Sequence, residues 1–212
     1  MTEKIYLDNA STTRINAEVL NEMNKVYTST FGNSSSLHSF GREASSLIDN
    51  SRDTIANAIN AKSNEIYFTS SGSEANSWAI IGIANANKSK GNHIITSKIE
   101  HESVLQACKY LEKNGFKVTY LDVDKNGFIN FAGLLRAITD KTILISIMAA
   151  NNEIGTIQNI KAISHIAHDK NIVFHKTEKD VSELKNVSLK TVYNAIFAGG
   201  LSEKEMSKLG VD

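Results

Sequence analysis

A loop of small polar residues at 70–76, with the sequence S-S-G-S-E-A-N, precedes a helical pattern and could bind an anion. Glycine lets the backbone approach a ligand, and serine hydroxyls donate hydrogen bonds. The free N–H groups and the dipole of a helix N-terminus favour a group such as phosphate. Ser71 and Glu74 also fit a capping box, which caps a helix and binds no ligand. The sequence leaves both interpretations open.

Three other stretches carry side chains that could contact a ligand. An imidazole at His101 could stack on a planar heteroaromatic ring or transfer a proton, although a loop histidine is also ordinary polar surface. Side-chain amides at Asn151 and Asn152 could hydrogen-bond a ligand oxygen, or could form a turn before Gly155. His175 follows an apolar run, where a structural role is equally open.

Alternating strand and helix patterns should position these residues. Strands are expected at 65–69, 93–96, 117–123, 142–148 and 171–175. Helices are expected at 17–27, 42–59, 74–87, 103–114, 131–138 and 160–169. This order predicts an α/β fold with a mostly parallel sheet covered by helices. Ligands of such sheets collect at the carboxyl ends of the strands, so the four stretches should meet at one edge around an anion-anchored, ring-shaped ligand.

Composition narrows the class of protein. The chain has 212 residues, 41% of them hydrophobic and 22% charged, which is typical of a globular protein. Equal numbers of basic and acidic residues, 23 each, give no global field that favours nucleic acid or an anionic membrane. No stretch approaches the roughly 20 apolar residues of a membrane span, and no signal peptide opens the sequence, so a cytoplasmic protein is expected. Cys108 is the single cysteine, and its helical context predicts a buried structural thiol.

Five motifs, at 6–13, 31–38, 71–76, 96–101 and 151–155, follow one another in a known order. Together they resemble the cysteine desulfurases, the NifS-like members of the class V aminotransferase superfamily, over about residues 1–175. The resemblance implies an incomplete large domain of the fold type I pyridoxal-phosphate transferases, and a homodimer as the working form. It also implies a protein of iron-sulfur cluster or thiocofactor assembly.

The resemblance also implies roles for single residues. Gly72 and Ser73 match the pair that holds the phosphate of pyridoxal phosphate. His101 matches the residue that stacks on the pyridine ring and assists proton transfer, and Asn152 matches the amide that bonds the phenolic oxygen of the ring. In the family, the cofactor forms a Schiff base with a lysine, and L-cysteine is converted to alanine while a cysteine thiolate takes the sulfur for an acceptor protein.

The chain departs from the family near its last expected strand. Thr177 stands where the family has an aspartate that pairs with the pyridinium nitrogen, and Glu178 and Asp180 are out of register with that position. The family's Ser-x-His-Lys segment and its nucleophilic cysteine loop have no counterpart in the sequence. Lys176 is the candidate substitute for the family's Schiff-base lysine, but it begins a charged stretch that is expected to be solvated. A truncated chain, inactive alone, is therefore expected.

Residues 176–212 are expected to form a short helical tail unlike the family, separate from the partial large domain at 1–175. The tail faintly resembles a helix-turn-helix in reversed order, but basic residues are not concentrated there, so DNA binding is disfavoured. Three functions stay open: a truncated desulfurase, a non-catalytic binding or regulatory module or partner of a full-length relative, and a DNA-binding fusion. The exposed sheet edge of a partial domain predicts self-association.

Overall fold

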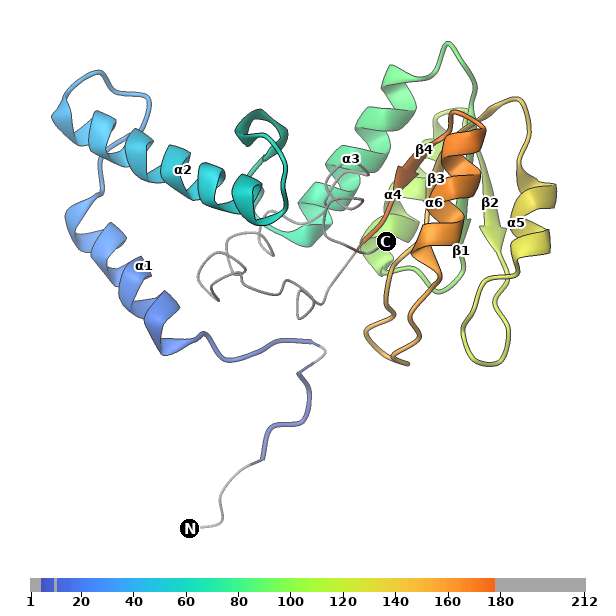
Figure 1. Ribbon diagram of the computed structural model, residues 1–212, viewed down its shortest axis with the longest axis horizontal. Coiled ribbons are helices and arrows are strands. Elements are labelled where there is room, and N and C mark those ends of the chain that lie inside the picture. Colours follow the sequence, from blue (N-terminus) through green and yellow to red (C-terminus); the bar gives the residue numbers. More distant parts are fainter. Residues whose placement is uncertain (1–4, 10, 178–212) are drawn as a thin grey trace.

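Four parallel strands form the centre of the computed structural model, which describes residues 5–9 and 11–177. The strands are β1 (His93–Ser97), β2 (Lys117–Leu121), β3 (Thr142–Ser146) and β4 (Val173–His175), in the order β2-β1-β3-β4 (Figure 1). Because all neighbouring pairs are parallel, their carboxyl ends lie at one edge. The predicted α/β class with a mostly parallel sheet is confirmed.

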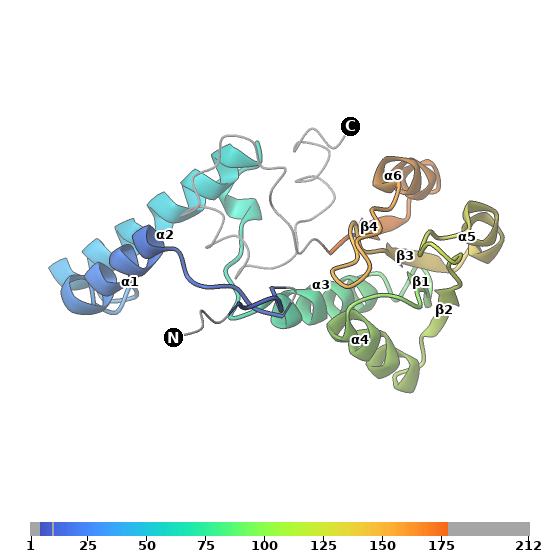
Figure 2. The ribbon, with the colours of Figure 1, turned by 90° about the horizontal axis from the view of Figure 1, so that it is seen from below.

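Helices cover both faces of this sheet (Figure 2). α3 (Gly72–Ala86) and α4 (Glu102–Lys113) pack on one face, and α5 (Phe131–Ala137) and α6 (Ile160–Asp169) pack on the other. The strands alternate between the two cores, since Ile94 and Leu144 belong to the α3/α4 cluster while Ile95 and Ile145 belong to the α5/α6 cluster. We call residues 72–177 the sheet unit.

Two helices precede the sheet unit and extend away from it (Figure 1). They are α1 (Ala17–Ser29) and α2 (Ser39–Ala58), followed by the 3₁₀ turn η1 (Ser63–Glu65). Ile55, Ala56, Ile59 and Ile66 form a small separate core here. We call residues 17–66 the helical arm.

The prediction of a strand at 65–69 is wrong. Ile66 is buried, but Tyr67 is 62% exposed and rests edge-on against Trp78. The segment is extended without a strand partner within the described residues. A β pattern becomes a strand only when another strand completes its hydrogen bonds, and the sequence of one segment does not supply that neighbour.

Helical spacing within the expected helix at 42–59 places Leu47, Ile48, Ile55 and Ile59 on one apolar stripe, of which only half is buried. Ile55 and Ile59 are 2% exposed, whereas Leu47 and Ile48 are 39% and 38% exposed. Helical spacing identified the face correctly, but only its C-terminal half is covered in this structure. No helix in the described part of the chain is long and apolar enough to cross a membrane.

Candidate active site at the carboxyl edge of the sheet

The N-terminus of α3 is capped and still offers free amide groups. Ser71 is the N-cap and its Oγ accepts from Glu74 N at 3.2 Å, while Ser70 N and Oγ both donate to Glu74 Oε2 at 2.6 Å. These bonds from Ser70 lower the pKa of the exposed Glu74 carboxyl. The backbone N–H groups of Gly72 and Ser73 make no hydrogen bond to a described residue. Ser71 therefore caps the helix, but Glu74 accepts from Ser70 and not from the N–H of Ser71, so the capping box is only half formed. The first two amides of the helix stay available to an anion.

Open space adjoins these amides. A Cβ built on Gly72 would meet no heavy atom of the described residues within 4 Å. The backbone can thus be approached closely at the helix end where the dipole is positive. This geometry suits an anion such as phosphate, one of the two interpretations that the sequence leaves open.

His101 caps the neighbouring helix α4. Its Nδ1 accepts from Ser103 N at 3.2 Å and lies 2.8 Å from Ser103 Oγ. Asn76, on α3, donates from Nδ2 to Ser103 Oγ at 2.9 Å. The two helix N-termini are thereby joined by side chains, and His101 is held beside the start of α3.

The loops after β1 and β3 are tied together by Asn151 and Glu100. Asn151 donates from Nδ2 to Ile99 O at 3.0 Å, and its Oδ1 accepts from Glu153 N and Ile154 N. Asn151 therefore forms the turn, while no hydrogen bond joins Asn152 to the described residues. The amide predicted to meet a ligand is the one left available.

Glu100 is a buried carboxyl that the sequence analysis did not single out. Its Oε1 accepts from Ser97 Oγ at 2.6 Å and Met148 N at 2.9 Å. Burial raises the pKa of Glu100 to about 7, and the two hydrogen bonds oppose that rise. Its Oε2 has no hydrogen-bond partner among the described residues. The available signal was only its position in a strand-end loop, which does not reveal burial.

The pairing of β3 with β4 extends past the assigned strands. Ile147 N donates to His175 O at 3.1 Å and Ala149 N donates to Thr177 O at 2.9 Å. Side chains alternate, and since Val173 packs on the α3/α4 side, His175 and Thr177 face that side as well. Thr177 thus sits in strand register at the edge where the four predicted stretches meet.

His175 and Thr177 bring further buried polar atoms to this side. His175 Nδ1 lies 2.9 Å from Ser146 Oγ, and burial lowers the pKa of His175 to about 4. His175 Nε2 and Thr177 Oγ1 are buried without a hydrogen-bond partner in the described chain. His175 is therefore a neutral, buried histidine at neutral pH.

The prediction of a solvated Lys176 is wrong. Lys176 is only 2% exposed, because the extended backbone pairing of β3 and β4 keeps it within the sheet. Alternation places Lys176 with Phe174 on the α5/α6 side, opposite His175 and Thr177. The remaining tail predictions, for 178–212, lie outside the described residues.

The prediction for Cys108 is confirmed. The residue is 0% exposed in the α3/α4 core, and burial, with smaller contributions from Glu100 and Glu112, raises the pKa of its thiol to about 12. A thiol so rarely ionised is a poor nucleophile at neutral pH.

Among the described residues no group of three or more His, Cys, Asp or Glu side chains could hold a metal ion.

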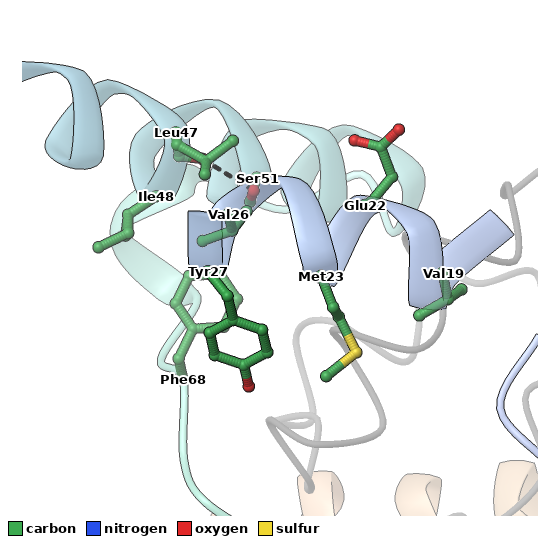
Figure 3. Close-up of a pocket in the computed structure, with 9 residues that line it drawn as sticks. All are labelled: Val19, Glu22, Met23, Val26, Tyr27, Leu47, Ile48, Ser51 and Phe68. Atoms are coloured by element: carbon green, nitrogen blue, oxygen red, sulfur yellow. Dashed lines mark hydrogen bonds between the residues drawn. The ribbon is translucent and has the colours of Figure 1, made fainter. Parts of the chain in front are cut away.

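An apolar pocket lies in the helical arm, away from this edge. It has a volume of about 340 Å³ and lies between α1 and α2, with Phe68 beside them (Figure 3). Its walls are formed by Val19, Glu22, Met23, Val26, Tyr27, Leu47, Ile48, Ser51 and Phe68. Tyr27 is 72% exposed, so apolar surface continues outside the pocket.

Comparisons with known proteins agree with this arrangement. A family model described as aminotransferase class-V matches residues 5–176. The cysteine desulfurase IscS of Clostridium botulinum is 53% identical over 175 residues, covering 82% of this chain and 44% of that protein. The corresponding protein of Methanosarcina thermophila is 53% identical over 171 residues, covering 81% and 42%.

A solved structure of a NifS-like protein has a similar fold. It superposes with a TM-score of 0.82 at 36% identity, covering 89% of this chain and 52% of that one. The chain thus spans about half the length of the relatives it matches. The resemblance inferred from the five motifs is confirmed.

Proposed function

The chain belongs to the class V aminotransferase family, and from this premise we propose that it is the N-terminal part of a cysteine desulfurase whose sheet edge binds pyridoxal phosphate. The proposed reaction of the whole protein removes sulfur from L-cysteine and leaves alanine. We propose that this chain alone binds the cofactor without turning over cysteine.

The observation that carries the proposal is the N-terminus of α3. Two amides, at Gly72 and Ser73, are available beside open space at the positive end of a helix dipole. His101 is fixed next to this helix through Ser103 and Asn76, and the Asn152 amide is left without a partner among the described residues. A phosphate, a ring face and a ring oxygen would each find a suitable group.

These residues would bind and orient the cofactor. Gly72 and Ser73 would hold its phosphate, Asn152 would hold the phenolic oxygen, and His101 would lie against the ring. When bound, pyridoxal phosphate supplies the electron-withdrawing ring on which the family's amino-acid chemistry depends. The capping bonds of Ser71 and Glu74 keep the helix end in place without occupying the two amides.

Two features argue against turnover by this chain alone. Lys98 is 2.5 Å from Asp122 in an exposed ion pair, and Lys176 belongs to the opposite side of the sheet, so neither is placed for a Schiff base. Thr177 replaces the carboxylate expected beside the pyridine nitrogen, and a neutral hydroxyl stabilises a pyridinium far less than an aspartate does.

Thermal unfolding with pyridoxal phosphate or inorganic phosphate tests the proposal. A ligand at about 100 times its Kd stabilises the folded state by about 2.7 kcal/mol, which raises Tm by roughly 5–10 °C. Gly72→Val should abolish the rise by filling the open space. Gly82→Val is the matched control, because it places the same side chain in open space on the same helix. Equal Tm shifts in the two variants would contradict the proposal.

A second function, as partner of a full-length relative, is favoured by the helical arm. Its pocket and the exposed Tyr27 and Phe31, 72% and 71% exposed, form apolar surface of the kind that interfaces cover. Mixing the chain with a full-length cysteine desulfurase and measuring mass by light scattering tests this function. Absence of a mixed species at micromolar concentrations would exclude it.

A further inference from the structure

Two helices of this chain begin with a histidine cap, and the two caps differ. His38 caps α2, where its Nδ1 accepts from Gly41 N at 3.4 Å. His101 caps α4, where its Nδ1 has the backbone N–H of Ser103 at 3.2 Å and the Ser103 hydroxyl at 2.8 Å. One ring nitrogen of His101 therefore faces two hydrogen-bonding groups, while that of His38 accepts one long bond.

The direction of each bond at His101 follows from what the groups can do. A backbone N–H only donates, so the Nδ1 that accepts it carries no proton. The Ser103 hydroxyl must then donate its hydrogen to Nδ1. Its oxygen lone pairs are left to accept, and Asn76 Nδ2 donates to that oxygen at 2.9 Å. The three residues form one ordered chain of hydrogen bonds from Asn76 to Ser103 to His101.

Asn76 is well placed to fix this order. It is 7% exposed on α3, so its amide is held by the packing of α3 against α4. Because the Asn76 amide donates to Ser103 Oγ, it favours the hydroxyl rotamer that points its hydrogen at Nδ1. His101 Nε2 makes no hydrogen bond with the described residues, so it is the ring nitrogen left available.

We infer that Asn76 and Ser103 are positioning residues that hold His101 in the tautomer with its proton on Nε2, the ring nitrogen that makes no hydrogen bond with the described residues. The inference rests on the proposed function for the identity of the ligand, but the tautomer is a property of the free chain. A proton on Nδ1 would face the Ser103 N–H and break that bond, and the Ser103 hydroxyl would have to turn its hydrogen away and accept instead. Proton exchange with a ligand must therefore pass through Nε2.

Nitrogen-15 NMR of histidine-labelled protein without cofactor measures the tautomer. The six histidines are assigned by substitution, with His101→Gln identifying the signal of interest. At pH 7.5 the wild-type chain should give Nδ1 of His101 the shift of an unprotonated nitrogen and Nε2 that of a protonated one. Ser103→Ala should raise the Nδ1–H to Nε2–H ratio about fivefold, which is ~1 kcal/mol, the usual worth of one neutral hydrogen bond.

Two further variants separate positioning from mere stability. Ser103→Thr keeps the hydroxyl and should keep the wild-type ratio. Asn76→Asp replaces the donor with an acceptor, turns the hydroxyl away from Nδ1 and should shift the ratio as Ser103→Ala does. The signals of His38 should not move in any of these variants.

An Nδ1–H tautomer in the wild type, or an unchanged ratio in Ser103→Ala, would overturn the inference. If pyridoxal phosphate fails to raise Tm while the expected Nε2–H pattern is seen, the proposed function fails and this inference stands. If Tm rises but the ratio does not respond to Ser103→Ala, the proposed function stands and the inference fails.

Discussion

The sheet unit and the helical arm bury their apolar side chains to very different extents. In the sheet unit both faces of the sheet are covered, and Ile80, Ile94, Leu134, Leu144 and Ile163 are 0% exposed. In the arm, the core is limited to a few residues around Ile55 and Ile59. The sheet unit has the layers that a stable α/β core needs, while the arm keeps a face without a covering element among the described residues.

The two regions also differ in the residues that they carry. Every residue proposed to meet the cofactor lies in the sheet unit, on segments tied by hydrogen bonds between α3 and α4 and between the loops after β1 and β3. The arm carries the apolar pocket and no predicted ligand residue. The residues proposed to bind the cofactor and the exposed apolar face thus lie in different regions of the chain.

Truncating a core side chain should distinguish the two regions most strongly. Leu144→Ala removes a fully buried side chain from the α3/α4 core and should lower the free energy of unfolding by about 2–5 kcal/mol. Leu47→Ala, at a site 39% exposed in the arm, should cost less than about 1 kcal/mol. Urea titrations followed by circular dichroism measure both, and equal costs would remove the distinction.

Much of the sheet unit was predictable because its pattern is local. Helical spacing and short β-branched runs placed α3 to α6 and the four strands within a few residues of their observed bounds. The failed strand at 65–69 and the buried Lys176 depend on which backbone lies alongside, which is not a local property. The arm was predicted as helices, but how much of its apolar face would be covered was not.

The candidate site shows the same limit. The predicted loops lie at one edge of the sheet, yet two identical side chains do not reveal that Asn151 forms the turn while Asn152 makes no hydrogen bond with the described residues. Glu100 was missed because its role needs Met148, far along the chain. The Asn76 to Ser103 bond likewise joins two helices, so its partners could not be identified from spacing.

Two buried titratable groups of the sheet unit should make its stability depend on pH in opposite directions. Glu100, with a pKa raised from 4.5 to about 7, contributes stability below pH 4.5 that is lost as pH rises through about 7. His175, with a pKa lowered from 6.5 to about 4, contributes stability above pH 6.5 that is lost as pH falls through about 4. The two trends oppose each other between pH 4.5 and 6.5.

Glu100→Gln should remove the contribution of Glu100, so that the pH dependence of stability due to His175 is seen alone. Because one pKa unit is about 1.4 kcal/mol, the free energy of unfolding of the variant should rise by a few kcal/mol more than that of the wild type between pH 4.5 and 7. Glu102→Gln, at an exposed carboxylate on α4, is the control and should follow the wild type. Urea midpoints at four pH values measure this, and parallel curves for all three proteins would contradict it.

A substitution that weakens self-association through the arm should have a smaller free-energy effect than the substitutions above. Leu47→Lys places a charge beside the pocket and should weaken dimerisation at least tenfold, about 1.4 kcal/mol, without lowering Tm. Leu135→Lys, at a site 50% exposed on α5, is the matched control in the sheet unit and should leave the dimer constant unchanged. Sedimentation equilibrium measures both. If the wild-type chain stays monomeric at about 100 μM, association through this surface is refuted.

Borohydride reduction of the chain with pyridoxal phosphate, followed by peptide mass mapping, tests the central claim most directly. We propose that the sheet edge holds the cofactor while no lysine of this chain forms a specific Schiff base. We expect a Tm rise that depends on Gly72, with substoichiometric pyridoxyl label spread over several lysines and no alanine formed from cysteine above the free-cofactor background. Stoichiometric label on one lysine, together with alanine production, would contradict it.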